Sequence, residues 1–113
     1  MEIIYHLTFK KNRVLFRKSK PYRTDSLDSE GFIHCSPKDK VRSSAAKFFK
    51  KEKEILLIYI DQSKVRSEII WEDSNNDNFL FPHIYGELNF EAVIEIAEIS
   101  RDENGIFVFP DGF

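Results

Sequence analysis

Three histidines are the residues of this chain best suited to chemistry. Imidazole changes charge near neutral pH and serves as a base, a hydrogen-bond donor or a metal ligand. Each histidine lies in a short apolar or aromatic run typical of a strand: His6 in residues 5–8, His34 in residues 32–36 and His83 in residues 81–86. A single half-buried histidine is more often a hydrogen-bonded core residue, but three in similar settings predict one shared cleft.

Side chains beside these histidines extend the candidate site. Trp71 and Tyr85 are large enough to stack on a flat heterocycle, although large aromatics in a small domain are more often core residues. Glu72 follows Trp71 at the end of an expected strand, where a carboxylate can bind sugar hydroxyls, assist proton transfer or simply be solvated. If residues 83–85 are extended, His83 and Tyr85 share one side and can contact the same ligand.

The residues after His34 predict a strand that runs directly into a helix. Ser36 is expected to cap this helix, with Pro37 at its first position and Asp39 completing a variant capping box. Free amides at a helix start suit an anion, although Pro37 removes one donor. We therefore assign Ser36 to the ligand-binding set, together with Thr8 from the first histidine run.

Cys35 is the single cysteine, so neither an internal disulfide nor a thiolate zinc centre is expected. It follows His34 directly and points to the opposite strand face, which favours a buried thiol over a cysteine–histidine nucleophile. Three imidazoles can also bind a zinc ion. Because their spacings contain no local pair such as His-x-His, we expect no native metal.

The composition predicts one globular domain over residues 1–113. Hydrophobic residues make up 42% of the chain and charged residues 32%, which fits a modest core with a charged surface. The longest apolar run, residues 55–60, is too short to span a bilayer, and the first residues lack the pattern of a secretory leader. We expect a cytoplasmic protein with no membrane partner.

Charge is distributed unevenly along the chain. Residues 1–53 contain 14 Lys and Arg against 6 Asp and Glu, whereas residues 54–113 contain 3 against 13. The basic segment from residue 10 to residue 23 could face phosphates, including those of a nucleic acid. The alternative is a solvated face that pairs with the acidic half after folding.

Hydrophobic periodicity predicts an α+β fold with two helices on a split or bent, mixed or antiparallel sheet. Residues 92–99 fit either a helix or a strand, but their β-branched content and the following Asn104-Gly105 turn favour a strand. A polar loop is expected over residues 73–78. A helix beginning at Ser36 should bury a stripe formed by Val41, Ala45, Phe48 and Phe49. The other expected elements are a helix over residues 10–18 and strands over 2–8, 31–35, 55–60, 67–72, 79–86 and 106–109.

Several blocks of the chain resemble a known family. They are residues 4–8, residues 30–36 with the sequence Glu-Gly-Phe-Ile-His-Cys-Ser, residues 71–72, and residues 81–89, which begin Phe-Pro-His-Ile-Tyr-Gly. On these blocks the chain is identified as a member of domain-of-unknown-function family 952, small bacterial proteins without an established activity. The family fold is similar to the split sheet of ADP-ribosyltransferases, including the RNA 2′-phosphotransferase branch.

The resemblance implies roles for particular residues. His6 would bind the nicotinamide ribose of NAD, and His34 would contact the nicotinamide ring. Glu72 and His83 are both candidates for the third catalytic position, which is commonly an acid and has no clear match here. The implied function is NAD-dependent ADP-ribosyl or related phosphoryl transfer in a histidine-lined cleft. The alternatives are a non-catalytic module that binds a nucleotide or ADP-ribose, and a partner-binding domain that uses the basic half.

Overall fold

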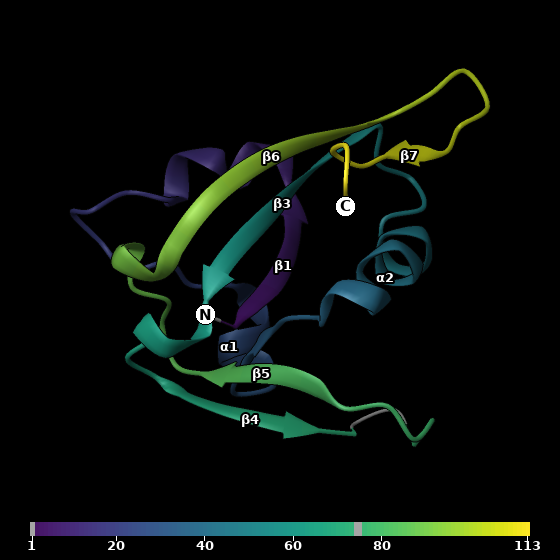
Figure 1. The fold of residues 1–113 in the computed structure, drawn as a ribbon. Helices are drawn as coiled ribbons and strands as arrows, with labels where there is room; N and C mark the ends of the chain where they lie inside the picture. Colours follow the sequence, from purple (N-terminus) through teal and green to yellow (C-terminus); the bar gives the residue numbers. More distant parts are fainter. Residues whose placement is uncertain (1, 74–75) are drawn as a thin grey trace.

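Two antiparallel sheets form the framework of the protein, whose computed structural model describes residues 2–73 and 76–113 (Figure 1). The strands of the first sheet lie in the order β1-β3-β6-β7 and those of the second in the order β2-β5-β4. The α+β class and the split antiparallel sheet are therefore confirmed. The strands are β1 (Ile3–Phe9), β2 (Ile33–His34), β3 (Glu54–Asp61), β4 (Glu68–Glu72), β5 (Phe81–Tyr85), β6 (Val93–Arg101) and β7 (Phe107–Val108).

The helices are short. The longer one, α2 (Val41–Phe48), lies beside the first sheet, and α1 (Asp25–Ser29) lies near the second (Figure 1). The helix expected over residues 10–18 is a 3-10 helix, η1 (Lys10–Leu15), and α1 has too few turns to produce a recognisable periodicity. The remaining 3-10 helices are η2 (Lys38–Lys40), η3 (Gln62–Lys64) and η4 (Phe90–Ala92).

Ser36 does not cap a helix, so that prediction is wrong. Its amide donates to the Tyr5 carbonyl (2.7 Å) and its carbonyl accepts from the Tyr5 amide (2.9 Å), which pairs it with β1. Both backbone groups of Ser36 are thus used in extended structure, and η2 begins only after Pro37. The amide cradle for an anion that we expected at Ser36 is therefore not formed.

The core is divided into two layers by the first sheet. Leu56, Ile58 and Ile60 of β3 pack between the two sheets, and the alternating residues Ile55 and Leu57 pack toward α2. Both faces of β3 are covered, which explains its continuous apolar run. In α2, Val41 and Ala45 are buried as predicted.

Phe48 departs from the expected stripe, because its side chain is exposed at the end of α2.

The prediction of a strand over residues 92–99 is confirmed by β6, which pairs with β7 across a turn containing Gly105 at φ +78°. In the predicted loop, Ser74 and Asn75 lie outside the described residues. Within residues 2–73 and 76–113, no helix is both long and apolar enough to cross a membrane.

Candidate functional site

A cleft of about 770 Å³ opens beside the end of β1, and its wall draws on η1, α1, β2, α2 and β5. This volume lies in the range of small-molecule sites. All three histidines contribute to the wall, as do Thr8 and Ser36. Side chains that are separated by up to 77 positions in the sequence thus border one space.

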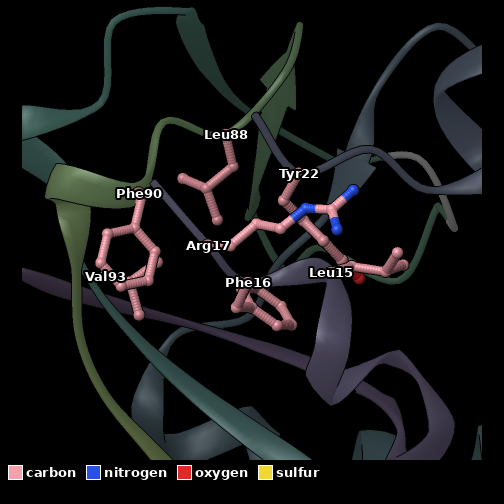
Figure 2. A pocket seen from close by; sticks show the side chains of 7 residues that line it. All are labelled: Leu15, Phe16, Arg17, Tyr22, Leu88, Phe90 and Val93. Carbon is pink, nitrogen blue, oxygen red and sulfur yellow. The ribbon is translucent and has the colours of Figure 1, made fainter. Parts of the chain in front are cut away.

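A second hollow lies among the seven residues drawn in Figure 2, which come from the segments before β2 and after β5. Most of these side chains are apolar, including Phe16, Leu88 and Phe90. It has essentially no free volume for a water-sized molecule. It is a packing gap, and the larger cleft is the candidate site.

His6 is buried in the wall of the cleft, and both of its ring nitrogens have protein partners. Nδ1 lies 2.7 Å from the backbone oxygen of His34, and Nε2 lies 2.8 Å from the Tyr22 hydroxyl. Burial lowers the pKa of His6 to about 4, so the ring is neutral at pH 7. Because a carbonyl only accepts, Nδ1 carries the proton and Nε2 accepts from Tyr22. His6 is therefore not free to act as a base.

The Tyr22 hydroxyl links His6 to a chain of polar groups. The Tyr22 oxygen lies 3.1 Å from Thr8 Oγ1, and Thr8 Oγ1 accepts a hydrogen bond from the Asn12 side-chain amide at 2.8 Å. Burial raises the pKa of Tyr22 to about 12. The network holds the end of β1 against residue 22, and Thr8 lies in the cleft wall mainly as a member of this network.

His34 is the most solvated of the three imidazoles. It extends from β2, and the Glu30 carboxylate accepts a hydrogen bond from its Nε2 at 2.7 Å. Glu30 immediately follows α1, so this short helix, which the sequence did not predict, supplies the partner. His34 can contact a ligand in the cleft without disturbing the core.

His83 extends from β5 and is only 1% exposed. Its Nδ1 lies 2.8 Å from Glu72 Oε1. Phe32 stacks on the ring with centroids 4.1 Å apart and planes 13° apart, and the His34 ring lies 5.3 Å away edge-on. The His83 ring is thus packed against the Phe32 and His34 rings, and His83 also lines the cleft.

Glu72 and Tyr85 support His83 from outside the cleft wall. The Tyr85 hydroxyl donates to the same Glu72 oxygen that accepts from His83. The hydrogen bond from Tyr85, followed by that from His83, lowers the pKa of Glu72, and the carboxylate raises the pKa of Tyr85. His83 and Tyr85 share a face, as expected for an extended segment, but Tyr85 binds a protein carboxylate in this arrangement.

Trp71 does not lie in the wall of the cleft. It faces the core between the sheets, and its Nε1 donates to Gln62 Oε1 at 3.2 Å. Strand alternation explains this, because Glu72 and Trp71 are neighbours on β4 and must point to opposite faces. The expected stacking of Trp71 on a ligand is not met.

The sequence did not place several residues of the cleft wall beside the histidines. Phe9 and Phe48 are large apolar side chains that border the cleft while remaining 42% and 63% exposed. Lys11 and Arg23 also line it, and both belong to the basic segment at residues 10–23. Their type was visible in the sequence, but their position relative to the histidines depends on the fold.

The basic segment pairs in part with acidic residues, as one of the two sequence-based alternatives proposed. Lys10 contacts Glu54 at 2.6 Å, and Arg23 contacts Asp28 at 2.6 Å and Glu87 at 3.1 Å. Lys11 has no ion pair with any residue in the described ranges. It is therefore a cation in the cleft wall that remains available to a ligand.

Cys35 is buried in the core between the sheets, and this burial raises the pKa of its thiol. The thiol thus stays protonated and is a poor nucleophile, in agreement with the buried role expected. Within the part of the chain that the structure describes, no group of three or more His, Cys, Asp or Glu is arranged to hold a metal ion.

Comparisons with known proteins agree with the family and the fold. A family model described as "Protein of unknown function (DUF952)" matches residues 9–96. The crystal structure of protein CC0527 from Caulobacter crescentus superposes with a TM-score of 0.81 at 22% identity, covering 94% of this chain and 93% of that one. The solution structure of CC0527 gives a TM-score of 0.77 at 23% identity, with coverages of 94% and 91%. No curated protein matches the chain.

These structures share the fold of the chain, and their descriptions state no activity. Neither is described as an ADP-ribosyltransferase, so the comparisons do not support the expected likeness to that fold. What they do support is the coarser description of an α+β protein with two antiparallel sheets. A function must therefore be inferred from the geometry of the cleft.

Proposed function

The chain belongs to the DUF952 family, which has no assigned activity. From the cleft we propose that the protein binds a small nucleotide-like ligand with a flat apolar group and a negative charge. The observation that carries this proposal is the composition of the wall. Exposed aromatic side chains border the same space as imidazole, lysine and arginine. Ligand sites typically combine an apolar lining with a few polar groups that fix orientation.

The aromatic part of the wall suits a base or a similar ring. Phe48 and Phe9 expose large apolar surfaces although they lie in a concave site, which is unfavourable unless something covers them. Phe9 is held edge-on by Phe49, with ring centroids 5.4 Å apart. A planar heterocycle would gain both apolar burial and stacking at this position.

The polar part of the wall suits a phosphate and hydroxyl groups. Lys11 supplies a cation that no described acid neutralises, and the polar residues Thr24 and Ser26 border the same space, with their hydroxyls hydrogen-bonded to each other at 2.6 Å. Glu30 and Asp25 also line the cleft, and Glu30 is already bound to His34. Carboxylates can accept hydrogen bonds from sugar hydroxyls, so the mixture favours a phosphorylated nucleoside over a simple anion.

AMP is expected to bind more tightly than adenosine, roughly fivefold for one partly exposed ion pair, and the difference should shrink as salt screens the charges. Isothermal titration calorimetry at low and high ionic strength measures both ligands. Lys11→Gln should remove most of the preference for AMP. The matched control Lys18→Gln, in the same basic segment but outside the cleft wall, should keep it. Equal affinities that do not respond to salt would contradict a phosphate site.

His34→Ala is expected to weaken AMP binding while changing the free energy of unfolding by less than about 0.5 kcal/mol, because the imidazole is half exposed and only one surface contact is lost. Calorimetry and urea unfolding measure the two effects. A stability loss as large as that of a core substitution, together with unchanged AMP affinity, would make His34 a structural residue.

NAD-dependent transfer is the second candidate, because His34 and His83 border one cleft. The cleft does not fit NAD in one respect: His6, which the resemblance assigns to the nicotinamide ribose, has both ring nitrogens bound within the protein. Incubation with NAD and chromatography of the products distinguishes the candidates. Release of nicotinamide would favour a transferase, and recovery of intact NAD would favour the binding module.

A further inference from the structure

We propose that His83 is a general base, positioned by Glu72, that activates a water molecule for hydrolysis of an ester bond in the cleft. The inference rests on the proposed function, because the substrate would be a carboxylic ester of the nucleotide-like ligand that the cleft binds. It rests on a buried imidazole that lines the cleft, with one nitrogen bound to a carboxylate and the other without a hydrogen bond to any described residue.

The Glu72 contact fixes the protonation pattern of the ring. The pKa of Glu72 is lowered, first by the Tyr85 hydroxyl and then by His83, so this side chain is a carboxylate at neutral pH. A carboxylate only accepts hydrogen bonds, so Nδ1 of neutral His83 carries the proton at the 2.8 Å contact. Nε2 then holds the free electron pair that a base requires.

Nε2 has no hydrogen bond to any described residue, although the ring is almost fully buried. Yet no fully buried side-chain nitrogen or oxygen in the described ranges lacks a partner. Nε2 must therefore be the part of the ring that reaches the surface of the cleft, which His83 lines. A water molecule or ligand hydroxyl at this surface can donate a hydrogen bond to it.

The other two histidines lack this combination. His6 uses Nε2 to accept from Tyr22 and Nδ1 to bind a backbone oxygen. His34 uses Nε2 to bind Glu30, and its ring is half exposed instead of being clamped. Only in His83 do an oriented ring, a supporting carboxylate and an open nitrogen occur together, which is the arrangement of a histidine base in hydrolases.

The reaction step is hydrolysis. Nε2 takes a proton from water as the water oxygen forms a bond to the carbonyl carbon of the ester. The bond from that carbon to the leaving oxygen then breaks, and the leaving group departs with the electron pair. The products are a carboxylic acid and an alcohol or phenol, and the imidazolium returns its proton to solvent or to the leaving group. Glu72 stabilises the imidazolium, so it acts as a positioning residue.

Hydrolysis of p-nitrophenyl acetate, followed by p-nitrophenolate absorbance from about pH 5 to 9, tests the proposal. The unmodified protein is expected to accelerate hydrolysis. His83→Gln should lower this rate by at least about tenfold. The control Lys18→Gln, at a position outside the cleft wall, should retain it. No acceleration, or equal rates for the unmodified protein and His83→Gln, would overturn the proposal.

Glu72→Gln provides a second variant if His83→Gln fails to fold. The rate is expected to fall roughly 10- to 100-fold, as for other partners that orient an imidazole. The fall should appear in kcat while the KM for p-nitrophenyl acetate stays similar, because Glu72 lies outside the cleft wall and orients the base without contacting the ester. An unchanged kcat would overturn the positioning role of Glu72.

AMP binding separates this inference from the proposed function. AMP binding with hydrolysis that does not depend on His83 would overturn the general base and leave the binding function intact. Hydrolysis that depends on His83 without any AMP binding would support the general base and overturn the nucleotide-like ligand class. Inhibition of hydrolysis by AMP would support both.

Discussion

Replacing Ile58 with alanine is expected to lower the free energy of unfolding by about 2–5 kcal/mol. Ile58 lies in the middle of β3, fully buried between the two sheets, where its neighbours on β1 and β6 are His6 and Ile96. Removing its outer carbons leaves a cavity that flanking strands cannot close, because each is fixed by backbone pairing on β3. Urea unfolding followed by circular dichroism measures the loss.

Ile94→Ala is the matched control for this substitution. Ile94 lies on β6 and is 47% exposed, so the same chemical change creates no cavity. The free energy of unfolding should change by no more than about 0.5 kcal/mol. Similar losses for the two variants would show that Ile58 is not in the main core.

Acid is expected to destabilise the protein between about pH 6.5 and pH 4 because of His6. Burial lowers the pKa of His6 from 6.5 to about 4 in the folded state, so the unfolded chain binds more protons in this range. The contribution of His6 to stability is therefore complete at pH values above its pKa in the unfolded chain. It is lost as the pH falls toward its pKa in the folded protein. A shift of this size corresponds to about 3 kcal/mol, measured as the unfolding free energy at successive pH values.

His6→Gln tests the origin of that loss. Glutamine does not titrate, so the variant should be less stable at pH 7 but should lose little more between pH 6.5 and pH 4. His34→Gln removes a half-exposed imidazole and should keep the steep dependence. Glu72 and Asp61 have lowered pKa values, so their contributions are lost at more acidic pH. An acid dependence that persists in His6→Gln would assign the effect to other groups.

The strands could be predicted from the sequence because their signals are local. The apolar run at residues 55–60 marked β3, and the turn at Asn104-Gly105 correctly decided that residues 93–101 form β6. The helical segments were predicted less well. Backbone pairing of Ser36 with Tyr5 overrides the helix-capping pattern, and these residues are 31 positions apart. A window of neighbouring residues contains no information about such a contact.

The sequence by itself determined which side chains are available for chemistry: three imidazoles in strand-like runs, an acid beside Trp71 and a basic segment at residues 10–23. Only the tertiary structure decided what each can do. It places Tyr22 against His6 and Glu72 against His83. The Tyr22 contact occupies Nε2 of His6, which could otherwise act as a base. The Glu72 contact involves Nδ1 of His83 and leaves Nε2 of that ring without a protein partner. The reason is physical: the properties of an imidazole depend on the partners of its two nitrogens and on its burial, and both are set by residues distant in the chain.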